Sequence, residues 1–138
     1  MKKVLLFSSL YIMILLSCSS DNDGISSKIV GQWLCTSGTT TVYDLKTGEV
    51  NKYPDSTLYP EGSGFYFYDD GTCYYLYQGI KIDCTYKIRG DKIDIIDENN
   101  IMTDDIEFSD GKMILSRDVT DTEVMMRRIV RVSVFEKK

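Results

Sequence analysis

Short β-type segments separated by turn residues run through most of this chain. Val, Ile, Thr, Tyr and Phe alternate with polar residues from residue 29 onward, and Gly, Asp, Asn and Ser interrupt the pattern at short intervals. This alternation predicts strands that bury one face, and no helical period is sustained. The first expected strand covers residues 29–35 and ends at Ser37-Gly38. The longest expected loop covers residues 53–64, and the last strand covers 124–135.

Two consecutive hairpins in the middle of the chain allow a register prediction. A two-residue loop at Gln78-Gly79 fixes which residues face each other, and Gly90-Asp91 does the same for the next hairpin. The predicted inward pairs are Tyr77 with Ile80, Tyr75 with Ile82, Cys73 with Cys84, Ile88 with Ile93, and Tyr86 with Ile95. The predicted outward pairs are Leu76 with Lys81, Tyr74 with Asp83, and Lys87 with Asp94. Both hairpins therefore share one apolar face.

These segments form about eight strands in simple up-and-down order, and antiparallel meanders of this kind protect their edges best by closing into a barrel. We expect an all-β fold, an up-and-down antiparallel β-barrel, over residues 28–138. A chain of this length holds one domain comfortably and is too short for two.

The N-terminus has the layout of a secretory signal. Lys2 and Lys3 precede an apolar run over residues 4–16, and Ser17-Cys18 follows. The run is shorter than the roughly 20 residues that a membrane-spanning helix needs. Residues 15–18, Leu-Leu-Ser-Cys, resemble the lipobox of bacterial lipoproteins. This resemblance implies a signal peptide over residues 1–17 and a lipid, such as palmitate, on Cys18.

Residues 18–27 read as the lipidated Cys followed by a flexible, polar tether. The Ser-Ser-Asp-Asn-Asp sequence over residues 19–23 resembles the export signal of Bacteroidota-type surface lipoproteins. The resemblance implies an outer-membrane protein at the cell surface, held through the lipid on Cys18. A location on the periplasmic side stays open.

Charge and composition exclude several classes of function. The chain has 16 Lys and Arg residues against 21 Asp and Glu, and removal of residues 1–17 leaves 14 against 21. Such acidity argues against nucleic acid as a partner. The chain contains no histidine, which excludes Ser-His-Asp and Cys-His catalysis and His-ligated zinc. The acidic doublets Asp69-Asp70 and Asp104-Asp105 read as solvated turns, because neighbouring residues on a strand point to opposite sides. We therefore predict no enzyme, no metal and no cofactor.

Three short motifs carry a family resemblance. Gly31-Gln32-Trp33 resembles the G-x-W motif that opens lipocalins. The turn over residues 67–72 and the hairpin over residues 85–93 resemble the lipocalin-like domains of small Bacteroidota lipoproteins. The resemblance implies that Trp33 plugs one end of the barrel, with a late arginine, Arg128 or Arg131, across its ring.

A lipocalin-like barrel implies a possible interior pocket, since eight strands are just wide enough to be filled by side chains or to hold one small ligand. The predicted lining residues are Trp33, Phe65, Phe67, Tyr75, Tyr77, Ile82, Tyr86 and Ile95. Two functions stay open. Either the barrel binds a small apolar or aromatic molecule, or it is filled, and outward tyrosines such as Tyr74 bind a protein partner in an outer-membrane assembly.

Cys73 and Cys84 are a candidate disulfide. The predicted register places them at a hydrogen-bonded pair, with Cα atoms near 5.5 Å, inside the disulfide range. The other reading is two reduced, buried thiols that act as small apolar residues. Cys35 is left over in either case.

Overall fold

The computed structural model describes residues 22–55, 58–119 and 126–138. The predicted signal peptide and Cys18 lie outside the described residues. The elements are α1 (Asn22–Ile29), β1 (Gly31–Asp44), β2 (Val50–Pro54), β3 (Gly64–Phe67), β4 (Thr72–Tyr77), β5 (Ile80–Arg89), β6 (Lys92–Ile96), β7 (Ile101–Ser109), β8 (Lys112–Asp118) and β9 (Arg127–Lys137).

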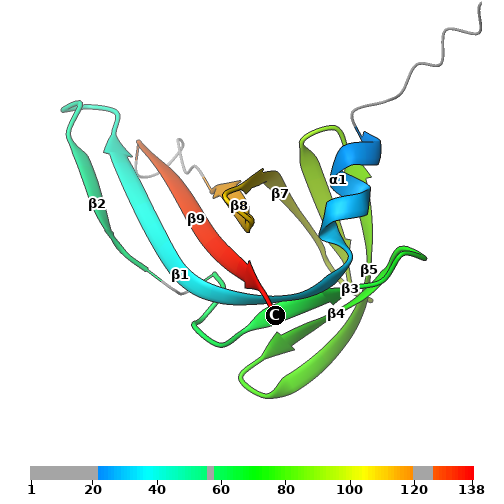
Figure 1. The fold of residues 1–138 in the computed structure, drawn as a ribbon. Coiled ribbons are helices and arrows are strands. Elements are labelled where there is room, and N and C mark those ends of the chain that lie inside the picture. Colours follow the sequence, from blue (N-terminus) through cyan, green and yellow to red (C-terminus); the bar gives the residue numbers. More distant parts are fainter. Residues whose placement is uncertain (1–21, 56–57, 120–125) are drawn as a thin grey trace, which may run out of the picture.

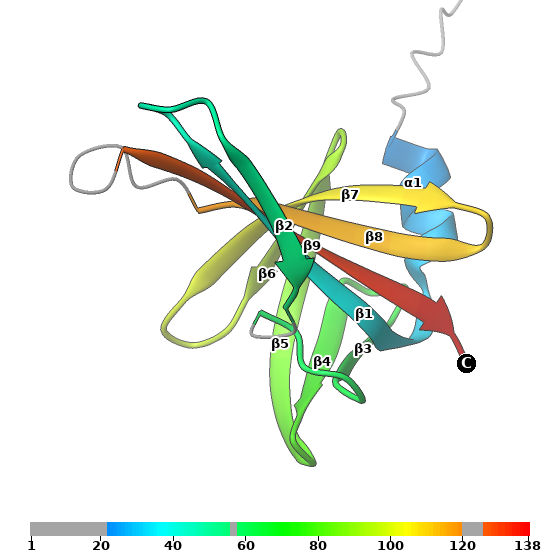
Figure 2. The same cartoon turned by 90° about the vertical axis from the view of Figure 1, so that its left-hand side faces the viewer.

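The strands form a closed antiparallel barrel, as predicted from the alternation. Each strand from β3 to β9 pairs with the next, and β9 pairs with β1, which pairs with β3 (Figure 1). Eight strands thus close the ring, and β2 is an extra strand on the distal half of β1. Figure 2 shows this distal half, with β2 and the start of β9, reaching beyond the ring. The all-β barrel is confirmed.

Strand β1 is longer than the sequence indicated. The expected end at Ser37-Gly38 is wrong, because β1 continues to Asp44 after a bulge between Cys35 and Ser37. A bulge bends a strand and increases its twist, so one strand pairs with β3 before the bulge and with β2 after it. The Ser-Gly pair that reads as a turn therefore lies within one strand, directly after the bulge.

The predicted hairpin registers are confirmed. Cys73 faces Cys84, Tyr75 faces Ile82, and Tyr86 faces Ile95. Gln78 and Gly79 both have positive φ, 48° and 81°. This is the type I′ loop that matches the twist of antiparallel strands. It fixes which residue of β4 faces which residue of β5.

Helix α1 covers residues 22–29, where the sequence predicts part of a flexible tether (residues 18–27) and the start of the first strand (residues 29–35). Its last residue, Ile29, is buried, and the Ile29 carbonyl accepts a hydrogen bond from Trp33 Nε1 at 2.7 Å. The helix thus covers the end of the barrel at which β1 begins (Figure 1). Within the described residues, no helix has the length and apolar character needed to cross a membrane.

Candidate functional site at the barrel mouth

Five of the eight predicted lining residues are brought together, and their rings pack on one another. Phe65 stacks on Phe67 and on Tyr75, with ring centroids 5.3 and 4.8 Å apart, and Tyr86 meets Phe67 edge-on at 4.9 Å. Tyr77 continues this group beside Tyr75. Such contacts stabilise a core beyond the area they bury. A ligand at this level of the barrel would have to displace these rings, and its binding stays a prediction.

The other three lining residues lie elsewhere. Ile95 is fully buried in the core, whereas Ile82 is 37% exposed at the rim. Trp33 lies at the α1 end, beside Phe108. The cation over its ring is Lys137, at 5.3 Å, so the expected arginine is wrong. Arg128 lies instead over Tyr43, and Arg131 faces Asp55.

The opposite end, which we call the mouth, contains a buried polar network that the sequence did not reveal. The Tyr59 hydroxyl donates to Asp104 Oδ2 at 2.6 Å. Arg117 donates to both oxygens of Asp104, at 2.5 and 2.8 Å, and to the Tyr59 hydroxyl at 3.1 Å. Each polar group of this triad therefore satisfies another, which a buried charge requires.

Tyr59 belongs to the connection between β2 and β3, yet its ring lies inside the barrel. It meets Phe65, Tyr75 and Phe135 edge-on, at centroid distances of 5.3 to 5.8 Å. A turn after Tyr59 fixes this position, because Ser63 N donates to Pro60 O at 2.9 Å. Gly62 has a φ of 81°, as the third residue of a type II turn requires.

The edge of β1 holds this segment in place. Cys35 N donates to Ser63 O at 2.8 Å, and Cys35 Sγ donates to Tyr59 O at 3.2 Å. Burial raises the pKa of the Cys35 thiol, and burial with the charge of Asp104 raises that of Tyr59. Both groups therefore stay neutral donors at physiological pH. Burial opposes the charge of Arg117, but bonds to Asp104 and Tyr59 raise its pKa overall.

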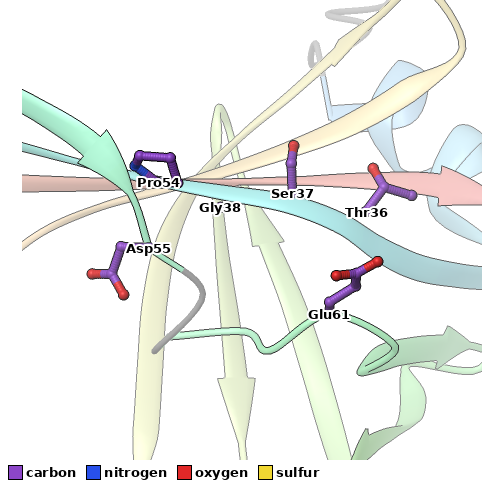
Figure 3. A pocket seen from close by; sticks show the side chains of 6 residues that line it. All are labelled: Thr36, Ser37, Gly38, Pro54, Asp55 and Glu61. Carbon is purple, nitrogen blue, oxygen red and sulfur yellow. The ribbon is translucent and has the colours of Figure 1, made fainter.

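A polar pocket lies beside this segment, in the gap that the bulge leaves between β2 and β3. Its volume is about 260 Å³, and its lining residues are Thr36, Ser37, Gly38, Pro54, Asp55 and Glu61 (Figure 3). Asp55 Oδ2 accepts a hydrogen bond from Thr40 at 2.5 Å and lies 3.7 Å from Arg131 Nε. The two charged residues that line the pocket, Asp55 and Glu61, are both acidic, and no aromatic residue lines it, unlike the interior pocket expected from the sequence.

A second set of tyrosines lies on the outer surface of β3 and β4 and just beyond β3. Tyr66 stacks on Tyr74, with centroids 5.5 Å apart, and contacts Tyr68 at 4.7 Å. Lys81 from β5 lies 4.8 Å above the Tyr74 ring and forms an ion pair with Asp83. Tyr68 is 42% exposed. We call Tyr66, Tyr68 and Tyr74 the tyrosine face.

Cys73 and Cys84 face each other in the described structure as free thiols, with their Sγ atoms 3.0 Å apart. The disulfide itself stays a prediction. Cys18, the predicted lipid-bearing residue, lies outside the described residues. Within them, no group of three Cys, Asp or Glu side chains is placed to hold a metal.

The interpretation of Asp104-Asp105 as a solvated turn is wrong, because both residues lie within β7 and Asp104 is buried. Asp104 lies on the same side of β7 as Ile106, and Arg117 lies on the same side of β8 as Leu115. Alternation therefore puts a negative and a positive side chain on the inner side of two adjacent strands. Nothing in the pattern indicates that Tyr59 joins them from a connecting segment. No family model, no curated protein and no solved structure matches this chain.

Proposed function

We propose that this protein is a non-catalytic, lipid-anchored binding module with a filled barrel, and that its tyrosine face binds a protein partner. The observation that carries the proposal is that the aromatic residues form two separate groups, one inside the barrel and one on its surface. The inward rings contact one another in the core, whereas Tyr66, Tyr68 and Tyr74 form a contiguous cluster on the outside.

The chemistry of the tyrosine face fits a protein surface. Tyrosine is enriched at the centres of interfaces, because its ring buries apolar area while its hydroxyl still finds a polar partner. Lys81 lies over the ring of Tyr74, and an arginine of a partner would be attracted to the neighbouring ring faces by the same cation–π interaction. The Lys81–Asp83 ion pair supplies a polar rim beside the rings.

The anchor is part of the same proposal. We assign residues 1–17 to a signal peptide and place the lipid on Cys18, from the charged start, the apolar run and the Leu-Leu-Ser-Cys sequence. The protein would then lie at the outer membrane, facing the cell surface. Cys18→Ala is expected to release it from the membrane fraction into the medium or the periplasm.

Site-specific photo-crosslinking in the native host tests the tyrosine face. A benzoylphenylalanine at position 68 is expected to capture a different protein, and the same group at Lys87, an exposed position on β5, is not. Tyr74→Ser should reduce the product at position 68 about tenfold, a typical loss at an interface hot spot. The matched control is Tyr43→Ser, which removes a tyrosine under Arg128, outside the tyrosine face.

Two results would count against this function. Equal capture from positions 68 and 87 would show unspecific contact, and no product from either position would leave the tyrosine face without a partner. A product made of two copies of this chain would assign the face to self-association instead.

A second function is favoured by one observation, the position of Tyr59. Its phenol ring occupies the mouth as a bound aromatic molecule would, with aromatic neighbours and two polar partners. A small aromatic ligand that displaced Tyr59 would meet the same contacts.

The small phenol p-cresol, which reproduces the tyrosine side chain, tests this second function. Titration calorimetry should show binding to Tyr59→Ala and weaker binding to the unaltered protein, where Tyr59 competes. Binding to the variant alone would make Tyr59 a permanent core residue. No binding to either would exclude this position as a ligand site.

A further inference from the structure

We propose that Cys73 and Cys84 form a disulfide that links β4 covalently to β5, and that Cys84 is the thiol that reacts first with the oxidant. The two residues are directly opposite each other in the β4–β5 register, and their Sγ atoms lie 3.0 Å apart. No movement of the backbone is needed to bring the sulfurs into reach, because opposite residues of antiparallel strands have Cα atoms within the disulfide range.

The surroundings distinguish the two thiols. Cys84 is itself buried, with 9% of its surface exposed against 3% for Cys73. It nevertheless lines a shallow hollow of about 350 Å³ where β6 ends, together with Asp83, Thr85, Ile96, Asp97 and Glu98. Cys73 does not line it and is buried, with Phe67 facing it from β3. An oxidant that approaches from solvent therefore meets Cys84 first.

Hydrogen bonding between the sulfurs favours the same order of events. The bond from Cys73 lowers the pKa of Cys84, and the same bond, together with burial, raises that of Cys73. The thiolate is the reactive form of cysteine. Cys84 is thus both the more accessible and the more easily ionised member of the pair.

The acidic rim of the hollow limits which oxidants react. Asp83, Asp97 and Glu98 surround Cys84 with negative charge, so a cationic or neutral disulfide approaches more readily than an anionic one. We therefore name small organic disulfides without negative charge as the class of oxidant.

The reaction balances as two thiol–disulfide exchanges, shown here with cystamine. The Cys84 thiolate attacks one cystamine sulfur, the S–S bond of cystamine breaks, and one cysteamine leaves as a thiolate that takes a proton from water. Cys73 then releases its proton to water and attacks the Cys84 sulfur, which expels the second cysteamine. The two protein thiols lose two electrons in total, and one cystamine is reduced to two cysteamines.

Peptide mapping of the full chain, purified under reducing conditions and then treated with cystamine, tests the pairing. Trypsin cleaves after Lys81, so Cys73 and Cys84 fall on separate peptides, residues 53–81 and 82–87. We expect these two peptides to be linked in the oxidised sample and separated by reductant. Cys35→Ser, which removes a thiol bonded to the Tyr59 carbonyl, should leave the linked pair unchanged.

The two single variants test which thiol reacts first with the oxidant. In Cys73→Ser, Cys84 should keep a cysteamine as a stable mixed disulfide. In Cys84→Ser, Cys73 should react with cystamine ~10-fold more slowly than Cys84 does in Cys73→Ser, since Cys73 is the more deeply buried thiol and does not line the hollow. Oxidised glutathione, which is anionic, should oxidise the unaltered protein more slowly than cystamine does.

Three results would overturn the proposal. Full alkylation of both Cys73 and Cys84 after cystamine treatment would show that no bond forms. A peptide linked through Cys35 would assign a different pairing. Equal rates of reaction with cystamine in the two single variants would show that Cys84 does not react first.

Discussion

Two aspartates on neighbouring strands bind an arginine in the same forked way, but one pair lies inside the barrel and the other outside. Asp104 on β7 is fully buried and pairs with Arg117, whose side chain is 16% exposed. Asp94 on β6 is 12% exposed and pairs with Arg89, which is 54% exposed. Asp94 also accepts a hydrogen bond from Thr103 at 2.7 Å.

The difference shows that solvent, and not the bonding pattern, decides how much each pair matters. If the Asp94 side chain is removed, the guanidinium of Arg89 can turn outward and be hydrated. If Asp104 is removed, Arg117 stays at the mouth without a counter-charge, and an unpaired buried charge costs far more than an exposed one. The interior triad should therefore contribute more to the stability of the fold than the outer pair does.

The largest expected effect comes from Asp104→Ala. It should lower the free energy of unfolding by roughly 3–5 kcal/mol, because Arg117 is left buried and unpaired. Urea denaturation, followed by the emission of the single tryptophan, Trp33, measures this loss. Asp94→Ala is the matched control and should lose much less. Equal losses would contradict the role of burial.

A compensating variant sharpens this result. Replacing the triad by Asp104→Leu, Arg117→Met and Tyr59→Phe together removes both charges and the hydroxyl. Most of the lost stability should return, because apolar residues of similar size replace a buried ion pair at little cost. A triple variant as unstable as Asp104→Ala would show that the charges themselves are needed.

A smaller effect is expected from Tyr59→Phe, which removes only the hydroxyl. The ring contacts with Phe65, Tyr75 and Phe135 remain. The hydroxyl loses the bond it donates to Asp104 and the bond it accepts from Arg117, and we expect a loss of about 2 kcal/mol because Arg117 keeps both of its bonds to Asp104. The same denaturation experiment measures it, with Tyr43→Phe as a control at the surface. No loss in Tyr59→Phe would mean that Arg117 alone satisfies Asp104.

The smallest effect concerns the outer pair and depends on pH. The hydrogen bonds from Arg89 and Thr103 lower the pKa of Asp94 to about 2. A lowered carboxyl pKa stabilises the folded state above the ordinary pKa of about 4, and this contribution is lost as the pH falls toward the folded value. The stability difference between the protein and Asp94→Asn should therefore shrink between about pH 5 and pH 2. A difference that is constant over this range would show that the charge of Asp94 contributes nothing.

Much of the barrel follows from local pattern. The registers of β4, β5 and β6 are set by two short loops and by period-two alternation, so facing pairs such as Tyr75 with Ile82 were predictable without any long-range information. The same alternation carries Asp104 to the inner side of β7, but the Asp104-Asp105 doublet reads as a solvated turn, so the buried pair with Arg117 was missed. Sequence alone therefore determined the fold class, the pairing of β5 with β4 and β6, and the inward set of rings.

The tertiary structure decided the rest, for reasons of closure and reach. Ser37-Gly38 is not a turn, because β1 continues after a bulge between Cys35 and Ser37 and pairs with β3, β2 and β9 along its length. Tyr59 enters the barrel because only the closed ring creates an interior site with Asp104 and Arg117 at its mouth. Lys137 rather than an arginine covers Trp33 because the register of β9 against β1 brings these two residues opposite each other. Such contacts join residues that are far apart along the chain, and they exist only once the ring is closed.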